Sequence, residues 1–95
     1  KHKNLHLIFG MVADKDVEKI LELLPSYGLY YFTKAQIPRA MSETKLKELG
    51  SQTGLRGNSF PNVNLALEAA LEKAGLDDLI IIFGSIFLAS EINKQ

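Results

Sequence analysis

Apolar and polar positions along the chain follow two alternating patterns. Short runs of apolar or aromatic residues predict four β-strands, at residues 5–9, 29–33, 58–60 (very short) and 79–83. Between these runs, apolar residues spaced three and four positions apart predict helices. A good N-cap residue stands before each of the first three helices: Asp14 or Asp16, Ser42, and Asn62 or Asn64. A last helix is predicted at residues 86–93.

Strands that alternate with helices predict an α/β domain with a mostly parallel sheet and helices on both faces. The run at 79–83 is apolar at every position, which is typical of a central strand in such a sheet. Ligands bind these sheets at the carboxyl ends of the strands. We therefore expect four loops to share one edge of the sheet and to carry any site: 10–16, 33–40, 58–62 and 84–85.

The composition excludes several classes of function. The 95 residues are enough for a single domain, residues 1–95, and no linker or repeat divides them. Eleven basic residues balance eleven acidic ones, which argues against a nucleic-acid partner. The lack of cysteine excludes a disulfide scaffold, a thiolate metal site and a cysteine nucleophile. Because the longest apolar run is far shorter than the roughly 20 residues of a membrane helix, we expect a cytoplasmic protein without a membrane partner.

Gly84 and Ser85 follow the most apolar strand and open the last predicted helix. The free N–H groups of a helix N-terminus favour a carboxylate or phosphate, glycine lets a ligand approach the backbone, and the Ser85 hydroxyl adds a donor. A plain N-cap at a tight turn explains the same two residues. The sequence favours the N-cap and leaves anion binding open.

Charged residues gather on two other loops of the predicted edge. Asp14, Lys15 and Asp16 suit a ribose, a cation or an ammonium group, but helix capping and the helix dipole explain them as well. Lys34 and Arg39 are the cations of the second loop. Arg39 offers a planar fork for a carboxylate or phosphate, and the alternative is that both cations are simply solvated.

Other familiar chemistry is missing from the chain. His2 and His6 show no metal-ligand spacing, and we expect them to belong to a frayed terminus. No phosphate loop, dinucleotide fingerprint, nucleophile elbow or zinc-protease motif is present. The chain alone therefore has no complete catalytic apparatus that its motifs reveal.

Four stretches carry a resemblance to a known family: LIFGMVADKD at 7–16, IPRA at 37–40, VNLALEAALEKA at 63–74 and IFGSIFLA at 82–89. In this order and spacing they resemble the C-terminal domain of folylpolyglutamate synthase/dihydrofolate synthase, which belongs to the Mur ligase superfamily. The resemblance covers nearly the whole chain.

This resemblance implies a Rossmann-like three-layer domain of an ATP-dependent C–N ligase in folate biosynthesis and one-carbon metabolism. Such an enzyme phosphorylates a carboxylate of folate or dihydropteroate, and the amino group of L-glutamate attacks the acyl phosphate. ATP and Mg²⁺ would bind mainly to a central domain with a phosphate loop, and none is expected in this chain alone. The partner of the domain would be the N-terminal ATPase domain of the same chain.

Carried over residue by residue, the resemblance implies two groups of site residues. One group would bind the incoming glutamate: Ser85, Gly84 and Arg39. The other would face the nucleotide and the cleft between domains: Asp14, Lys15, Asp16 and Lys34. Phe87 stands where the family often has tyrosine, so a hydrogen bond from that hydroxyl is lost.

The D-G-A-H-N-P stretch that begins this domain in the family is absent, as is the phosphate-loop domain. We therefore expect an N-terminally truncated fragment of a larger enzyme, with an exposed sheet edge, that alone neither hydrolyses ATP nor ligates glutamate. Two alternatives stay open: the C-terminal domain of a cell-wall Mur-type amino-acid ligase, and a non-catalytic receiver-like α/β module. Asp14 and Asp16 imitate the acidic cluster of a receiver. However, Thr33, Ser59 and Ser85 occupy strand ends where its phosphorylatable aspartate is expected.

Overall fold

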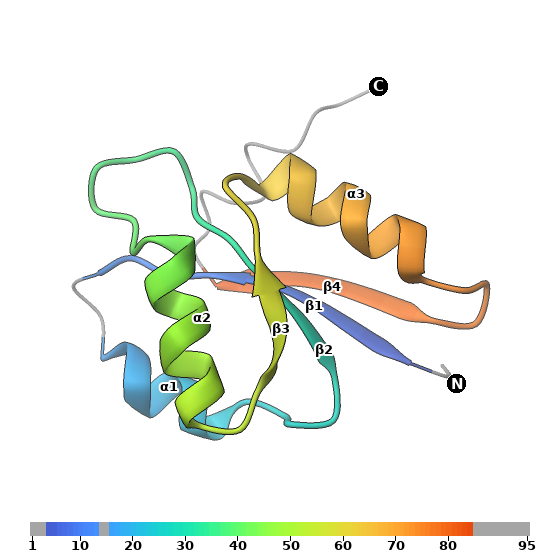
Figure 1. Ribbon diagram of the computed structural model, residues 1–95, viewed down its shortest axis with the longest axis horizontal. Helices are drawn as coiled ribbons and strands as arrows, with labels where there is room; N and C mark the ends of the chain where they lie inside the picture. Colours follow the sequence, from blue (N-terminus) through green and yellow to red (C-terminus); the bar gives the residue numbers. More distant parts are fainter. Residues whose placement is uncertain (1–3, 14–15, 85–95) are drawn as a thin grey trace.

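The computed structural model describes residues 4–13 and 16–84. In this part of the chain, strands and helices alternate as the sequence predicts (Figure 1), in the order β1 (Leu5–Gly10), α1 (Val17–Leu23), β2 (Leu29–Phe32), α2 (Glu43–Gln52), β3 (Arg56–Ser59), α3 (Val63–Lys73) and β4 (Leu79–Gly84). The strands form one parallel sheet in the order β3-β2-β1-β4. The predicted α/β architecture with a parallel sheet is confirmed. The helix predicted at residues 86–93 lies outside the described residues.

The helices form layers on both faces of the sheet (Figure 1). From β1 to β3 the chain steps across the sheet in one direction, and from β3 to β4 it steps back. Because such crossovers are right-handed, α1 and α2 cover one face and α3 covers the other. Two cores result. Leu21 and Leu46 pack with Phe9 and Phe32 on the first face, and α3 packs against Ile8 and its neighbours on the second.

The position of β4 differs from the prediction. Its apolar sequence indicates a central strand, but among the described strands it pairs with β1 alone and so ends the sheet. The internal strands are β2 and β1, and the six residues of β1 are all buried. In β4, Phe83 packs on the face covered by α1 and α2, while Leu79 and Ile81 on the same face are exposed. Those two helices lie over β1, β2 and β3, and among the described residues nothing covers this part of β4.

The three helices begin where the sequence predicts, and each begins at the carboxyl edge of the sheet. The side chain of Asp16 accepts a hydrogen bond from the Lys19 N–H at 3.4 Å, and Ser42 caps α2 in the same way. Of the two asparagines considered for α3, Asn62 is the cap, accepting from the Leu65 N–H at 2.9 Å. These caps bind backbone N–H groups that the helix leaves without partners.

The start of β3 was less visible in the sequence. The observed strand begins at Arg56, two residues before the predicted one, and its sequence RGNS shows no apolar pattern. A Cβ atom on Gly57 would lie 2.1 Å from the Tyr30 carbonyl oxygen, so glycine is what allows β3 to approach β2.

No helix in residues 4–13 and 16–84 is long and apolar enough to cross a membrane.

Candidate functional site

The loops that follow β1 and β2 are joined by backbone hydrogen bonds at the carboxyl edge. Val12 and Ala40 form an antiparallel bridge. On either side of it, the Ala13 N–H donates to the Arg39 carbonyl at 2.7 Å, and the Met41 N–H donates to the Met11 carbonyl at 2.9 Å. Arg39 is therefore held beside the stretch that leads to Asp16. We call this paired segment, residues 11–13 and 39–41, the loop clasp.

Gly84 ends β4 directly beside Gly10, its register partner at the end of β1. Its φ angle of 111° lies in the region that only glycine adopts readily. A Cβ atom at this position would lie 2.0 Å from the Gly10 carbonyl oxygen. Both the backbone conformation and the close approach therefore require glycine. The end of β4 consequently exposes backbone, without a side chain, beside the last residue of β1, which directly precedes the loop clasp.

Lys34 lies on the same edge and pairs with the first turn of α2. Its Nζ atom is 3.8 Å from Glu43 Oε1. That carboxylate oxygen is buried and accepts no hydrogen bond. The neighbouring loop is fixed as well, because the buried Thr33 hydroxyl donates to the Phe60 carbonyl at 2.9 Å. Lys34 therefore lies beside the start of α2 with its charge close to that of Glu43.

A groove of about 260 Å³ lies between the starts of α1 and α2. Asp16 and Glu18 line it from α1, and Lys45 and Met41 line it from the start of α2. Asp16 therefore caps α1 and also lines a groove at the carboxyl edge. Both the capping interpretation and a surface role are compatible with this geometry.

The described residues of the predicted site all lie at the carboxyl edge. Asp16, Arg39 and Gly84 are placed there by the α1 cap, the loop clasp and the end of β4, and Lys34 follows β2. The other candidates, Asp14, Lys15 and Ser85, lie outside the described residues. Within residues 4–13 and 16–84, no group of three histidine, cysteine, aspartate or glutamate side chains is placed to hold a metal ion.

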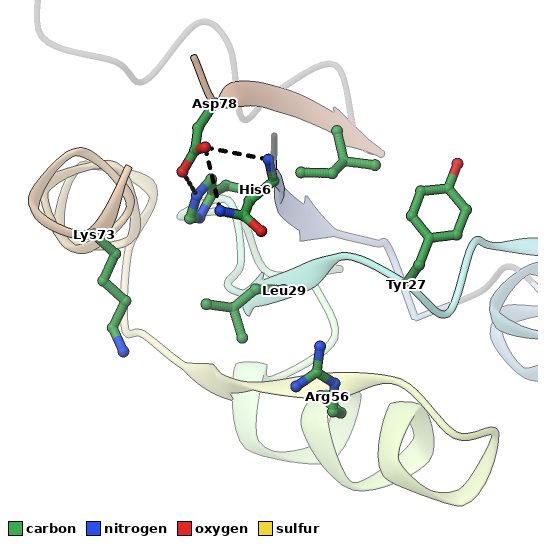
Figure 2. A pocket seen from close by; sticks show the side chains of 8 residues that line it. His6, Tyr27, Leu29, Arg56, Lys73 and Asp78 are labelled. Carbon is green, nitrogen blue, oxygen red and sulfur yellow. Dashed lines mark hydrogen bonds and ion pairs between the residues drawn. The ribbon is translucent and has the colours of Figure 1, made fainter. Parts of the chain in front are cut away.

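The expectation for His6 was wrong. The residue is buried, and it lies in β1 on the face covered by α3. Its Nε2 atom is 2.9 Å from Asp78 Oδ2 (Figure 2). On the other side of the ring, its Nδ1 atom is 2.8 Å from the Tyr31 hydroxyl. The partners stand 25 and 72 positions away, so no local pattern reveals them. His6 therefore belongs to a buried internal strand of the sheet and not to a frayed terminus.

Asp78 is the centre of a hydrogen-bonded cluster at the amino edge of the sheet, which we call the Asp78 cluster. Its carboxylate accepts hydrogen bonds from the Gly75 N–H, from His6, and from both the backbone and side-chain N–H groups of Asn4. The Gly75 hydrogen bond, followed by that of His6, lowers the pKa of Asp78 to about 2. Because an ionised carboxylate only accepts, His6 Nε2 is the donor in the bond to Asp78, and the Tyr31 hydroxyl lies at the other ring nitrogen, Nδ1. Burial, with a contribution from the Asp78 charge, raises the pKa of Tyr31 and keeps that hydroxyl a donor.

Comparison with known proteins places the chain in a family. The model of the family described as Mur ligase, glutamate ligase domain, matches residues 1–86. The chain belongs to this family. The predicted membership of the Mur ligase superfamily is confirmed.

Relatives of this Mur ligase domain carry names from folate metabolism. The chain is 28% identical over 91 residues to a probable bifunctional folylpolyglutamate synthase/dihydropteroate synthase of Haloferax volcanii. It is also 28% identical over 88 residues to the dihydrofolate synthase/folylpolyglutamate synthase of Buchnera aphidicola subsp. Schizaphis graminum. These matches cover 95% and 92% of the chain, but the chain spans only 11% and 21% of the two relatives.

The fold of the Mur ligase domain agrees with a solved relative. The structure of E. coli FolC in complex with DHPP and ADP matches with a TM-score of 0.83 and 27% identity. The match covers 95% of this chain and 21% of that one. The predicted fold is therefore confirmed by sequence and structure together, with helices on both faces of a four-stranded parallel sheet.

Proposed function

We propose that this Mur ligase domain is the C-terminal part of an ATP-dependent ligase that adds L-glutamate to folate or to dihydropteroate, in the cytoplasm. The relatives of the chain named above support the folate branch of the family. The observation that carries the proposal is the arrangement of Asp16, Arg39 and Gly84 along one edge of the sheet. This is the edge at which parallel α/β sheets bind their ligands.

In such a ligase, ATP supplies the phosphoryl group that converts a carboxylate into an acyl phosphate. The amino group of glutamate then forms a new C–N bond at the carbonyl carbon, the C–O bond to phosphate breaks, and the amine loses a proton. The present chain has no phosphate loop. Its residues are therefore assigned to binding and orienting glutamate and to closing the cleft.

Arg39, Gly84 and Ser85 form the proposed glutamate subsite. The guanidinium group of Arg39 suits a carboxylate because it donates two parallel hydrogen bonds. Arg39 is exposed, and the loop clasp fixes its backbone. The bare backbone at Gly84 allows a ligand to come close, and Ser85 adds a hydroxyl donor one residue further on.

Asp14, Lys15, Asp16 and Lys34 form the proposed surface toward the nucleotide and the ATPase domain of the same chain. Support comes from their loops, which follow β1 and β2 at the same edge. Lys34 contributes one positive charge that Glu43 partly balances. ATP and Mg²⁺ are proposed to bind mainly to the phosphate-loop domain, with this surface closing over them.

The experiment is an assay of the full-length protein with ATP, Mg²⁺ and L-glutamate. Dihydropteroate and tetrahydrofolate are tested as separate acceptors, and a cell-wall precursor that accepts amino acids serves as the third arm. We expect ADP and a glutamylated folate or pteroate, and no turnover by the 95-residue chain alone. Product with the cell-wall precursor only would assign the domain to the other branch of the family. No product with either folate acceptor contradicts the proposal.

A further inference from the structure

A second hollow lies at the amino edge of the sheet, at the opposite ends of the strands from the proposed glutamate subsite. It has a volume of about 380 Å³, within the size range of sites for small molecules. Its floor follows one row of register partners, in which Arg56 pairs with Leu29 and Leu29 pairs with His6. The C-terminal end of α3, which carries Lys73, forms one side (Figure 2). We call this hollow the amino-edge pocket.

The negative charge in the amino-edge pocket is already satisfied. Asp78 Oδ2 accepts from His6 Nε2 at 2.9 Å and from the Gly75 N–H at 3.0 Å. Its Oδ1 accepts from the two N–H groups of Asn4 at 3.1 and 3.3 Å. Four donors therefore hold this carboxylate, and it has little capacity left for a cation from solution.

The two cations of the pocket are not balanced in this way. Both line the pocket, and in Figure 2 Arg56 extends from β3 toward Leu29, while Lys73 extends from the end of α3 on the other side of Leu29. Within residues 4–13 and 16–84, neither side chain forms a salt bridge or hydrogen bond, and both are exposed. The charge that is free to meet a ligand is therefore positive.

The remaining walls are partly apolar. Leu29 is half-buried at the centre of the floor, and Tyr27, which is 74% exposed, stands at the far side. An exposed aromatic ring beside an apolar floor and two cations suits a molecule that has both an anionic head and a flat apolar body. Free phosphate alone would use the cations and leave these walls without a partner.

We propose that the amino-edge pocket binds a small organic anion. Its carboxylate or phosphate group lies between Arg56 and Lys73, and its apolar part lies on Leu29 toward Tyr27. The site is separate from the carboxyl edge, because the six residues of β1 separate the two ends of the sheet by roughly 15–20 Å. It does not depend on the proposed ligase activity.

The test is a titration of the ¹⁵N-labelled chain followed by NMR, with four probes. Benzoate and phenyl phosphate carry an anionic head on a ring, benzamide is the uncharged match of benzoate, and inorganic phosphate lacks the ring. We expect benzoate or phenyl phosphate to shift the amide signals of Leu29, Arg56 and Lys73, and the tighter of the two identifies the preferred head group. Inorganic phosphate and benzamide are expected to bind about tenfold more weakly or not at all.

Matched variants locate the binding. Arg56→Gln and Lys73→Gln are each expected to raise the dissociation constant of the better probe about tenfold, because each removes a charged donor. Lys19→Gln removes the same charge from an exposed position on α1 and leaves binding unchanged. Unaltered binding in both pocket variants contradicts the proposal. The proposal is also contradicted if benzoate binds no more tightly than benzamide, or if phenyl phosphate binds no more tightly than inorganic phosphate. It is contradicted as well if neither benzoate nor phenyl phosphate shifts these amide signals at concentrations up to about 10 mM.

Discussion

His6 and Asp78, 72 positions apart in the chain, are joined by a hydrogen bond of 2.9 Å between Nε2 and Oδ2. Both side chains are 5% exposed. The bond ties the first part of β1 to the residue that precedes β4, and Tyr31 extends it to β2. The amino edge of the sheet is therefore held by side chains as well as by the backbone ladder. Water has little access to this bond, and it is not equivalent to a solvated surface pair.

Replacement of Asp78 by alanine is expected to destabilise the fold. The substitution removes four accepted hydrogen bonds and leaves the donor on the buried His6 ring without its partner. Urea denaturation measures the change as a lower midpoint. The neighbouring Asp77 is exposed, so Asp77→Ala is the matched control and is expected to leave the midpoint nearly unchanged. Equal midpoints for the two variants would show that the Asp78 cluster does not stabilise the chain.

The same carboxylate makes stability depend on pH in the acid range. The pKa of Asp78 is about 2 in the folded chain against an ordinary value of 3.8, chiefly because the Gly75 N–H bonds its charged form. A lowered folded pKa gives stability that is fully present above about pH 4 and is lost as the pH falls toward 2. We therefore expect the free-energy gap between the wild type and Asp78→Asn to narrow from pH 6 to pH 2. A gap of constant size over this range contradicts the assignment.

Two glycines with positive φ angles predict different costs of substitution. Gly54 has a φ of 90° and open space around the position of a Cβ atom, whereas at Gly84 a Cβ atom would lie 2.0 Å from the Gly10 carbonyl oxygen. Gly54→Ala is expected to cost about 1 kcal/mol, the conformational penalty alone. Gly84→Ala is expected to cost about 3 kcal/mol, because the end of β4 must also move away from β1. Denaturation of both variants measures the difference, and equal costs would contradict the close approach at the strand ends.

Arg39 and Ser85 are expected to control the use of glutamate by the full-length protein. Arg39→Ala loses the forked donor and raises the KM for glutamate about tenfold or more. The KM of Arg39→Lys is expected to lie between the values of the wild type and Arg39→Ala. Ser85→Ala raises the same KM by a smaller factor. Lys47→Ala on α2 is the control for loss of one charge, and the midpoint of thermal unfolding shows whether each variant is folded. An unchanged KM for glutamate in Arg39→Ala or Ser85→Ala would remove that residue from the proposed subsite.

Features set by neighbours in sequence were predictable. Asp16, Ser42 and Asn62 cap the helices because their short side chains reach a backbone N–H three residues ahead, and that is a property of the local sequence. The carboxyl edge could also be predicted, since alternating strands and helices imply a parallel sheet. The place of Gly84 at the end of the last described strand could be predicted, but its φ angle and its contact with Gly10 could not.

Features set by distant neighbours were not predictable. The apolar run of β4 indicates burial, but not which strands lie beside it, so its place at the end of the described sheet was missed. His6 has the same difficulty, because its burial depends on Tyr31 and Asp78 in other strands and loops. In β3, Gly57 is selected by the approach of Tyr30 across the sheet, and no apolar pattern marks the strand. In each case, residues that are distant in the sequence decide the structure, so the local sequence alone does not predict it.

The hydrogen bonds of the loop clasp make residues 11–13 and 39–41 a single mechanical piece. An insertion in one of the two segments would break the pairing of the other, so their lengths cannot vary independently. A ligand that displaced Arg39 would therefore move residues 11–13, after β1, together with residues 39–41, after β2. Loop grafts between relatives should consequently exchange both segments together.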